Sequence, residues 1–269
     1  MLRRKEHSVE WEKGVARIAM PHAKLMWEEQ WNQIVKVPNN PYNKRIICAS
    51  RGYMLSPKAA FFSHPRQCYE IRERAYDLYG VDRSLAHPPK PAKKVLFLQR
   101  ATSRHLDNVD ELKRIVESYG VEVEVKEFKG ATPLEEQIGA LSEVGIFVLV
   151  HGAGGSSIPF LPYHAAVIEI FPHHWAPTMY KMIAAKCNAL YHLIHMEGQL
   201  SDELHWANEE QKIECEEMSR RDATKYDPCA LRYKQATVKV DPLRFEEVLI
   251  DALQDIGYNL RIQERRPPQ

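Results

Sequence analysis

The sequence predicts an α/β fold built on a Rossmann-like, mostly parallel sheet, and three observations predict it. Apolar runs of strand length alternate with helix-like segments of about ten residues from Val95 to Ile194, the order that right-handed crossovers between parallel strands produce. A glycine-rich turn directly follows one fully apolar run. The chain has 269 residues, of which 44% are hydrophobic and 27% charged, and this composition is typical of a globular domain with a sizeable core.

Two proline-rich stretches divide the chain, VPNNPYNK at residues 37–44 and HPPKPAKK at residues 87–94, because proline interrupts regular structure. They predict a helical or connecting region at residues 1–90, the Rossmann-like domain at 91–260 and a frayed tail at 261–269.

Hydrophobic periodicity places the individual elements. Before residue 90 we expect an amphipathic helix between Ala23 and Val35, a short strand at 44–50 and a helix that ends at Gly80. Further strands are predicted at residues 95–99, 121–128, 146–150, 165–171 and 190–194. Further helices are predicted at residues 108–120, 132–141, 156–161, 177–187 and 241–256. Residues 197–227 are polar and weakly periodic, so we expect a long, partly irregular insertion there.

Two of the helix starts carry local signals. Asn108 is followed three residues later by Glu111, which is the spacing of a capping box. Asp241 is followed by Pro242, which combines an N-cap side chain with a proline in the first turn. We therefore expect both Asn108 and Asp241 to cap their helices.

Charge, hydropathy and cysteine spacing exclude several classes of function. The 37 Lys and Arg residues against 36 Asp and Glu leave a net charge of +1, which offers no general attraction to nucleic acid or to an anionic membrane. No apolar run approaches the roughly 20 residues of a transmembrane helix, and the charged start MLRRKEHSVEWEKG lacks the apolar stretch of a secretory signal. The five cysteines include no C-x-x-C pair, so neither a zinc site nor a redox dithiol is predicted. Their odd total leaves at least one unpaired within the chain.

The glycine-rich turn is HGAGGSS at residues 151–157, between a buried strand and a helix. In an open parallel sheet, ligands bind beyond the carboxyl ends of the strands. Glycines let a ligand approach the backbone, and the first N–H groups of a helix suit a phosphate. A tight structural turn is the alternative interpretation. The turn is neither G-x-G-x-x-G nor a Walker loop, so a dinucleotide or ATP is not expected.

Two arginines are predicted at the same edge of the sheet. Arg100 directly follows the strand VLFLQ, and Arg104 follows four residues later in RATSR. Guanidinium groups hold phosphate oxygens in a fork, whereas the alternative is a pair of solvated arginines.

Glu169 is a carboxylate within the apolar strand VIEIF. Because such a strand seldom contains an unpartnered charge, two interpretations stay open: an acceptor for a sugar hydroxyl, or an ion pair with a neighbouring arginine. His173 and His174 are predicted to be exposed loop histidines rather than metal ligands. No D-x-D motif occurs, and no metal is expected, because arginines and a helix N-terminus can replace a metal at a diphosphate.

Four segments, VLFLQRATSRHLDNVDELKRIVE, LEEQIGALSEVGIFVLVHGAGG, FLPYHAAVIEIFP and MYKMIAAKCNALY, together resemble the C-terminal half of the family 61 glycosyltransferases. Their order and spacing agree across residues 93–194, and YKQATVKVDPLRFEEVL is similar to the family's last strand and helix. Within the family the chain most resembles the branch of the EGF-domain O-linked N-acetylglucosamine transferase and the protein O-mannose N-acetylglucosaminyltransferase. Plant xylosyl- and arabinosyltransferases share the same motifs.

The resemblance implies a GT-B arrangement of which this chain is the C-terminal, donor-binding half. It implies an inverting, metal-independent transfer of N-acetylglucosamine or xylose from a UDP-sugar to a hydroxyl of a glycoprotein or polysaccharide, without a cofactor. The arginines are expected to face the diphosphate, beside the H-G-A-G loop and the carboxylate of the V-E-[LI]-F-P strand. Carried over residue by residue, the predicted donor-binding residues are Arg100, Arg104, His151, Gly152, Ala153, Gly154 and Glu169.

The resemblance also implies the lumen of the endoplasmic reticulum or Golgi, with membrane attachment only through a segment absent from this chain. Where the family usually has Leu-Thr-Asn after H-G-A-G, this chain has Gly155-Ser156-Ser157, which we expect to loosen the loop. Only 86 residues precede the HPPKPAKK stretch, so we expect a fragment without its acceptor domain, and the catalytic base is unassigned. A nucleotide-sugar-binding domain without catalysis and a structural or interaction module stay open as other functions.

Overall fold

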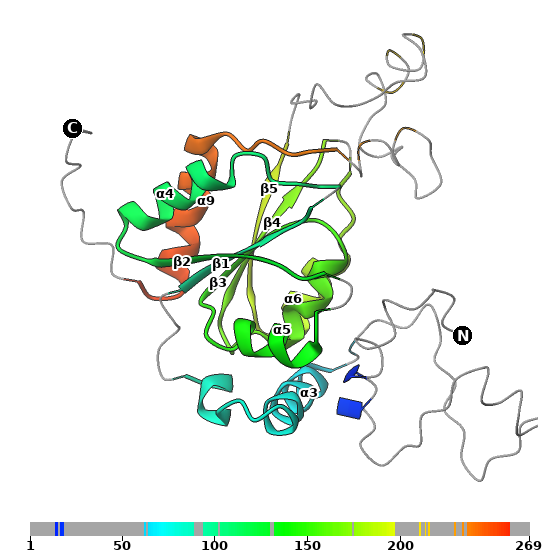
Figure 1. Ribbon diagram of the computed structural model, residues 1–269, viewed down its shortest axis with the longest axis vertical. Helices are drawn as coiled ribbons and strands as arrows, with labels where there is room; N and C mark the ends of the chain where they lie inside the picture. The colour runs from blue at the N-terminus through cyan, green and yellow to red at the C-terminus, as the bar shows by residue number, and fades with distance from the viewer. Residues whose placement is uncertain are drawn as a thin grey trace, which may run out of the picture.

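A computed structural model describes residues 14–15, 17–18, 62, 64–88, 94–101, 103–129, 132–173, 175–196, 210, 213, 215, 229, 233 and 236–258. At its centre lies a five-stranded sheet in the order β2-β1-β3-β4-β5, in which every neighbouring pair is parallel (Figure 1). The strands are β1 (Lys94–Gln99), β2 (Glu122–Glu127), β3 (Ile146–Val150), β4 (Ala166–Phe171) and β5 (Leu190–His195). The predicted α/β class with a parallel sheet is therefore confirmed.

The direction in which strands are added reverses between β1 and β3. From β1 the chain moves outward to β2, and it then returns to place β3 on the other side of β1. Doubly wound sheets bind ligands at the carboxyl ends of the strands at such a switch point, because the two connections leave toward opposite faces. The loop after β1 contains Arg100 and Arg104, and the loop after β3 contains residues 151–157. The two predicted loops thus flank the switch point.

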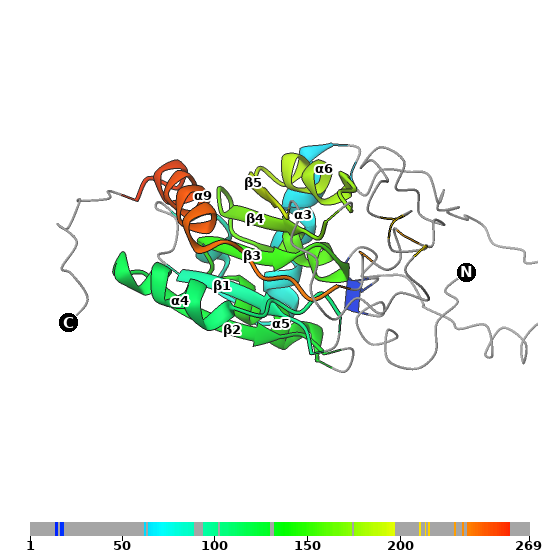
Figure 2. The same ribbon diagram turned by 90° about the horizontal axis from the view of Figure 1, so that it is seen from above.

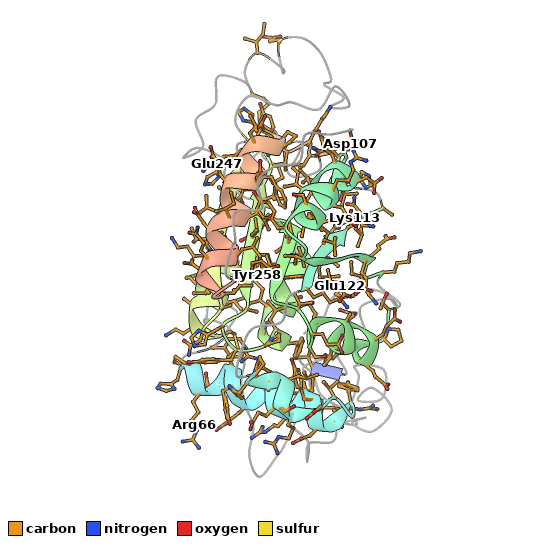
Figure 3. The ribbon with its side chains drawn as sticks, turned by 90° about the vertical axis from the view of Figure 1, so that its left-hand side faces the viewer. Arg66, Asp107, Lys113, Glu122, Glu247 and Tyr258 are labelled. Carbon is orange, nitrogen blue, oxygen red and sulfur yellow. A yellow bond between two sulfur atoms is a disulfide. The ribbon has the colours of Figure 1, made fainter. Side chains whose placement is uncertain are left out.

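Helices cover both faces of the sheet, as Figures 1 and 2 show. One face carries α4 (Val109–Ser118) and α9 (Pro242–Asp255), which lie side by side (Figure 3). The other face carries α5 (Leu134–Leu141), the 3-10 helix η2 (Ala153–Phe160) and α6 (Met179–Lys186). Outside that second layer, α3 (Pro65–Leu78) packs against η2 and is followed by the short 3-10 helix η1 (Arg83–Ala86).

Alternating strand residues supply a separate apolar core on each face. In β1, Phe97 faces α9, where its ring centroid lies 5.7 Å from that of Phe245, whereas Leu96 and Leu98 join the core under α5, η2 and α6. Every residue of β3 and β4 is buried, as a continuous apolar run predicts for a central parallel strand. The alternating strand β2 lies at the edge of the sheet, as its wet face predicts.

The two predicted helix caps have different outcomes. Asp241 caps α9 as expected, because its side chain accepts a hydrogen bond from the Arg244 N–H at 2.8 Å. Asn108 is the N-cap residue of α4 as expected, but its side chain makes no cap hydrogen bond to the backbone of the helix. Instead, Asn108 accepts from the backbone N–H of Val240 at 3.0 Å and donates to the Val240 carbonyl at 2.8 Å. A tertiary partner that satisfies both ends of the amide competes successfully with the local cap.

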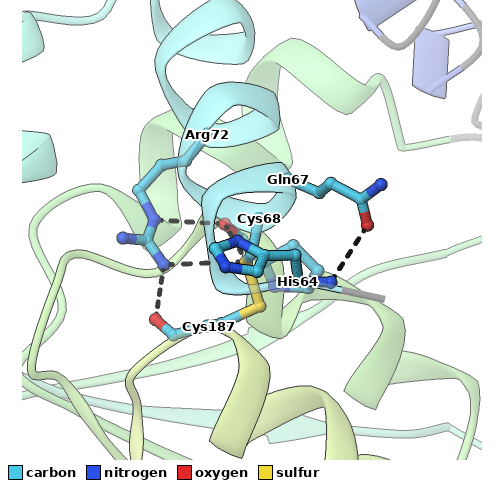
Figure 4. The surroundings of a disulfide bond; sticks show 6 residues. His64, Gln67, Cys68, Arg72 and Cys187 are labelled. Carbon is cyan, nitrogen blue, oxygen red and sulfur yellow. Dashed lines mark hydrogen bonds between the residues drawn. A yellow bond between two sulfur atoms is a disulfide. The ribbon is translucent and has the colours of Figure 1, made fainter. Parts of the chain in front are cut away.

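A covalent and polar clamp joins α3 to the second helix layer (Figure 4). Cys68 in α3 forms a disulfide with Cys187, at the end of α6. Arg72 is 1% exposed, and it donates from Nε to the Pro159 carbonyl at 3.2 Å and from Nη2 to the Cys187 carbonyl at 3.1 Å. The Tyr76 hydroxyl donates to the Phe160 carbonyl at 3.0 Å. Residues of α3 therefore share a core with the sheet domain, and the predicted division after residue 90 stays a prediction.

Several predicted features lie outside the described residues. They are the amphipathic helix at 23–35, the strand at 44–50, the tail at 261–269 and most of the insertion at 197–227. A second disulfide joins Cys215 and Cys229. In the ranges that the structure describes, no helix combines the length and the apolar character that crossing a bilayer requires.

Candidate functional site

A single glutamine side chain organises the arginine loop. Gln99, the last residue of β1, accepts hydrogen bonds through Oε1 from the N–H groups of Arg100 at 3.0 Å and Leu106 at 2.9 Å. Its Nε2 donates to the Leu106 carbonyl at 2.8 Å. The loop is therefore closed at both ends by one side chain, and Arg104 within it adopts a left-handed backbone with φ of 59°, which is uncommon for a residue other than glycine.

The segment before α9 holds the far end of this loop. Val238 forms a parallel bridge with Leu106, donating its N–H to the His105 carbonyl at 2.7 Å and accepting from the Asp107 N–H at 2.8 Å. The roles of Gln99 and Val238 were not predicted, because hydrogen bonds to the backbone leave no pattern in the sequence. Their effect is to fix Arg100 and Arg104 at the carboxyl edge of the sheet.

The glycine-rich loop turns directly from β3 into η2. The N–H of Gly155 donates to the Gly152 carbonyl at 2.9 Å, and the N–H groups of Ala153 and Gly154 belong to the first turn of η2, where a helix offers them no internal acceptor. That Gly155-Ser156-Ser157 loosens the loop stays a prediction. A Cβ at Gly155 would lie 2.5–2.6 Å from three carbons of the Tyr180 ring, so glycine serves a close contact there.

Both arginines lie directly over Gly152. Arg104 Nη1 donates to the His151 carbonyl at 3.1 Å, and a Cβ at Gly152 would lie 2.6 Å from Arg104 Nη1 and 3.2 Å from Arg100 Nη1. Neither guanidinium is paired with a carboxylate among the described residues. Arg100 donates from Nε to the Ser103 carbonyl at 2.9 Å. The structure thus brings the two predicted arginines and the predicted loop to one point.

The electrostatics of Arg104 are those of an unsatisfied cation. Its Nε is buried and has no hydrogen-bond partner in the described part of the chain. Burial lowers the pKa of Arg104 to about 10, and the positive charge of Arg100 acts in the same direction. An anion bound beside the two guanidinium groups would stabilise both charges.

Glu169 lies in the centre of the sheet and is 0% exposed. Its Oε1 lies 2.5 Å from His151 Nδ1, and its Oε2 accepts a hydrogen bond from the Tyr191 hydroxyl. Its partners are therefore a histidine and a tyrosine, rather than the arginine that one interpretation proposed. That it meets a sugar hydroxyl stays a prediction. Tyr191 was not anticipated as a partner, because only the pairing of β4 with β5 brings it to Glu169.

Aromatic rings surround the His151 imidazole. It stacks on Phe171 with ring centroids 5.3 Å apart and lies 5.1 Å from Tyr180 and 6.4 Å from Trp175. Burial raises the pKa of Tyr180 to about 12, and the negative charge of Glu169 adds to this rise. Burial likewise raises the pKa of Tyr191 far above its usual range. His151 and Glu169 are therefore buried among aromatic rings, next to the arginine loop.

The loop histidines differ from the prediction in part. His173 is half-buried rather than exposed, with its Nδ1 3.1 Å from the Met196 carbonyl and its ring against Tyr233, and His174 lies outside the described residues. Across the described ranges no group of three His, Cys, Asp or Glu residues is arranged to hold a metal ion. The two guanidinium groups and the first N–H groups of η2 are all hydrogen-bond donors. Together they can bind an anion whose oxygen atoms contact the guanidinium groups on one side and these N–H groups on the other.

Comparison with known proteins finds a matching family model and several curated relatives. A family model described as Glycosyltransferase 61 matches residues 14–168. The alpha-1,3-arabinosyltransferase XAT3 of Oryza sativa subsp. japonica is 32% identical over 88 residues, which is 33% of this chain and 15% of that protein. The beta-1,2-xylosyltransferase XYXT1 of the same organism is 32% identical over 101 residues, which is 38% of this chain and 20% of that protein.

A longer match covers most of the chain. The beta-1,2-xylosyltransferase XAX1 of Oryza sativa subsp. japonica is 24% identical over 265 residues, 90% of this chain and 46% of that protein. The chain thus spans less than half the length of the curated relatives it matches. These relatives are plant arabinosyl- and xylosyltransferases, so the finer similarity to the EGF-domain branch stays a prediction.

Proposed function

The chain belongs to the glycosyltransferase 61 family, and on that premise we propose that it binds a UDP-sugar and transfers the sugar to a hydroxyl of a glycan or glycoprotein. The described residues form the donor-binding half of a GT-B enzyme in this proposal. The transfer inverts the anomeric centre and requires no metal, because arginines supply the positive charge at the diphosphate.

One observation carries the proposal. Arg100 and Arg104, without a carboxylate partner among the described residues, converge on Gly152 at the switch point of the sheet. The glycine lets the two guanidinium groups approach the backbone closely, and two guanidiniums with unused donors match phosphate oxygens in charge and geometry. Isolated cations of this kind are costly to hold together unless an anion joins them.

The reaction follows from the same arrangement. The acceptor hydroxyl oxygen attacks the anomeric carbon and forms the new glycosidic bond, while the bond from that carbon to the UDP oxygen breaks. The departing diphosphate takes the electron pair, and Arg100, Arg104 and the N–H groups of Ala153 and Gly154 stabilise the charge that develops there. The acceptor proton passes to a general base, and we assign that base to no described residue.

The donor sugar is proposed to be a pentose. XYXT1 and XAX1 are named as xylosyltransferases and XAT3 as an arabinosyltransferase, which favours UDP-xylose or a UDP-arabinose over UDP-N-acetylglucosamine.

We place the protein in the lumen of the endoplasmic reticulum or Golgi. The pairs Cys68–Cys187 and Cys215–Cys229 support this proposal, because disulfides persist in oxidising compartments and are rare in the cytosol. Donor UDP-sugar and acceptor glycan meet in the same lumen in this scheme.

Calorimetry with UDP tests the proposed site. We expect Arg100→Ala to abolish UDP binding and Arg104→Ala to weaken it about 100-fold, since each removes charge-assisted hydrogen bonds to the diphosphate. Arg244→Ala, on the exposed side of α9, is the matched control and should leave UDP affinity unchanged. Unchanged affinity in Arg100→Ala would refute the assignment.

A thermal-shift series then sharpens the substrate. UDP, UDP-xylose and UDP-arabinose should raise the melting temperature, because they bind only the folded state. UDP-N-acetylglucosamine should raise it less than the two UDP-pentoses, and NAD should not raise it. Transfer of pentose to an oligosaccharide acceptor, followed by mass spectrometry, tests catalysis. UDP binding without transfer or hydrolysis would identify a binding domain instead, and no binding with a cooperative melt would identify a structural module.

A further inference from the structure

A completely buried carboxylate occupies the middle of the sheet. Glu169 is paired in register with Leu149 of β3 and Leu193 of β5, and it is 0% exposed. Removing an ionised carboxylate from water costs several kcal/mol unless its oxygens are fully satisfied. An apolar side chain at this position would cost less free energy on folding. We therefore expect the carboxylate to have a role in the site.

Both oxygens of Glu169 are already occupied. The Tyr191 hydroxyl donates to Oε2, and the His151 imidazole contacts Oε1 through Nδ1 at 2.5 Å. Because the carboxylate has no exposed surface, a bound sugar cannot reach it without displacing one of these partners. Glu169 therefore acts on a ligand through a neighbour rather than by direct contact.

His151 is the neighbour that leads to the diphosphate site. Its backbone N–H donates to the Ile170 carbonyl at 2.8 Å, and its own carbonyl accepts from Arg104 Nη1 at 3.1 Å. The residue whose ring is held by Glu169 is thus the residue whose peptide holds the guanidinium. Tyr180 and Phe171 close around the ring, so the imidazole has little freedom to turn.

We propose that Glu169 is a positioning residue of the donor site: the buried Tyr191–Glu169–His151 chain fixes the His151 peptide, and this peptide sets the guanidinium of Arg104 over Gly152. The inference rests on the proposed function, in which Arg104 binds the diphosphate of a UDP-sugar. In this inference Glu169 does not contact a sugar hydroxyl directly. It affects binding of the diphosphate through His151 and Arg104.

A double-mutant cycle on the full 269-residue chain tests this. We expect Glu169→Gln to weaken UDP binding about tenfold, the scale of a binding group displaced by part of an ångström. If Glu169 acts through Arg104, adding Glu169→Gln to Arg104→Ala should cause almost no further loss, because residues in one chain of contacts are not additive. Fully additive losses, measured by NMR titration with UDP, would overturn the inference.

Two further variants keep the test valid if Glu169→Gln folds poorly. Tyr191→Phe removes only the hydrogen bond to Oε2, and we expect a smaller loss of UDP affinity that again disappears in the Arg104→Ala background. Val248→Ala on α9, in the core of the opposite face, lowers stability without touching the chain and should leave UDP affinity unchanged. An equal loss of affinity in Val248→Ala would reduce the effect to general destabilisation and overturn the inference.

A second readout separates this inference from the proposed function. The Nε–H resonance of Arg104 in an NMR spectrum without UDP should shift in Glu169→Gln and in Tyr191→Phe, because the guanidinium leaves its position on the His151 carbonyl. If the chain does not bind UDP, the proposed function fails, and this resonance still decides whether Glu169 positions Arg104. An unshifted resonance in both variants contradicts the positioning role.

Discussion

Arg72 and Arg104 show two ways in which this fold buries a guanidinium. Arg72 donates from Nε and Nη2 to carbonyl oxygens at 3.1–3.2 Å, beside the Cys68–Cys187 disulfide. Arg104 makes one such bond and keeps a buried Nε without a partner in the described ranges, next to a second arginine. Burial lowers the pKa of both side chains. Arg72 is fully buried and Arg104 only partly so, and the two also differ in hydrogen bonding, because the guanidinium of Arg72 is held by carbonyl oxygens whereas Nε of Arg104 has no partner among the described residues.

We therefore expect Arg72 to contribute to the stability of the domain and Arg104 to contribute to ligand binding. Arg72 lies under η2 and α6, where it ties α3 to the sheet domain. Arg104 lies at the carboxyl edge, where the strand order reverses. Regions that bind ligands commonly retain destabilising features that the rest of the fold offsets.

Exchanging each arginine for methionine should give the largest contrast. Arg72→Met leaves the Pro159 and Cys187 carbonyls without their donors, so we expect the free energy of unfolding to fall by about 2–4 kcal/mol with UDP affinity retained. Arg104→Met removes a charge that burial disfavours, so we expect unchanged or slightly raised stability and a loss of UDP affinity of about 100-fold. Urea denaturation and calorimetry measure the two quantities. A fall in stability for both variants alike would break the comparison.

The neighbouring glycines extend the contrast to a smaller effect. Gly155→Ala drives a methyl group into the ring of buried Tyr180, and we expect a loss of about 1–3 kcal/mol in the free energy of unfolding. Gly152→Ala meets only the flexible guanidinium ends of Arg104 and Arg100, and its backbone φ of 168° suits any residue. We expect less than about 1 kcal/mol of destabilisation there and weaker UDP binding. A larger loss in the free energy of unfolding for Gly152→Ala than for Gly155→Ala, measured by urea denaturation, would contradict this geometry, as would unchanged UDP affinity in Gly152→Ala.

The smallest expected effect appears at alkaline pH. The pKa of Tyr180 rises to about 12 in the folded state, whereas an unfolded tyrosine titrates near 10. The folded state therefore holds this proton more tightly, so its contribution to stability is complete below about pH 10 and is lost as the pH rises toward 12. Tyr180→Phe should flatten the decline in stability above pH 10 by about 1 kcal/mol per pH unit at most.

Thermal melts from pH 9 to 11 measure that slope. Tyr258→Phe is the matched control, because Tyr258 (Figure 3) packs against the core that α4 and α9 cover, on the other face of the sheet from Tyr180. An identical slope in Tyr180→Phe and the unmodified chain would show that Glu169 and burial do not act on Tyr180 as described.

Much of the fold was predictable because local patterns and the final packing agree. The alternation of apolar runs and helical segments gave all five strands and the parallel sheet, and Asp241 with Pro242 gave the start of α9. Asn108 gave the start of α4, but its side chain makes no cap hydrogen bond, because it binds the backbone of Val240, 132 residues away. The disulfide between Cys68 and Cys187 spans 119 residues and has no local signal.

By itself, the sequence determined which residues gather at the site: Arg100, Arg104 and the loop at 151–157 follow strands, and the carboxyl ends of parallel strands share one edge. The tertiary structure decided how these residues are used. It buried Glu169 between His151 and Tyr191 and set Arg104 against Gly152. Local spacing determines which residues follow which strand, but contacts between distant strands depend on register, burial and competition among partners, which exist only once the chain has folded.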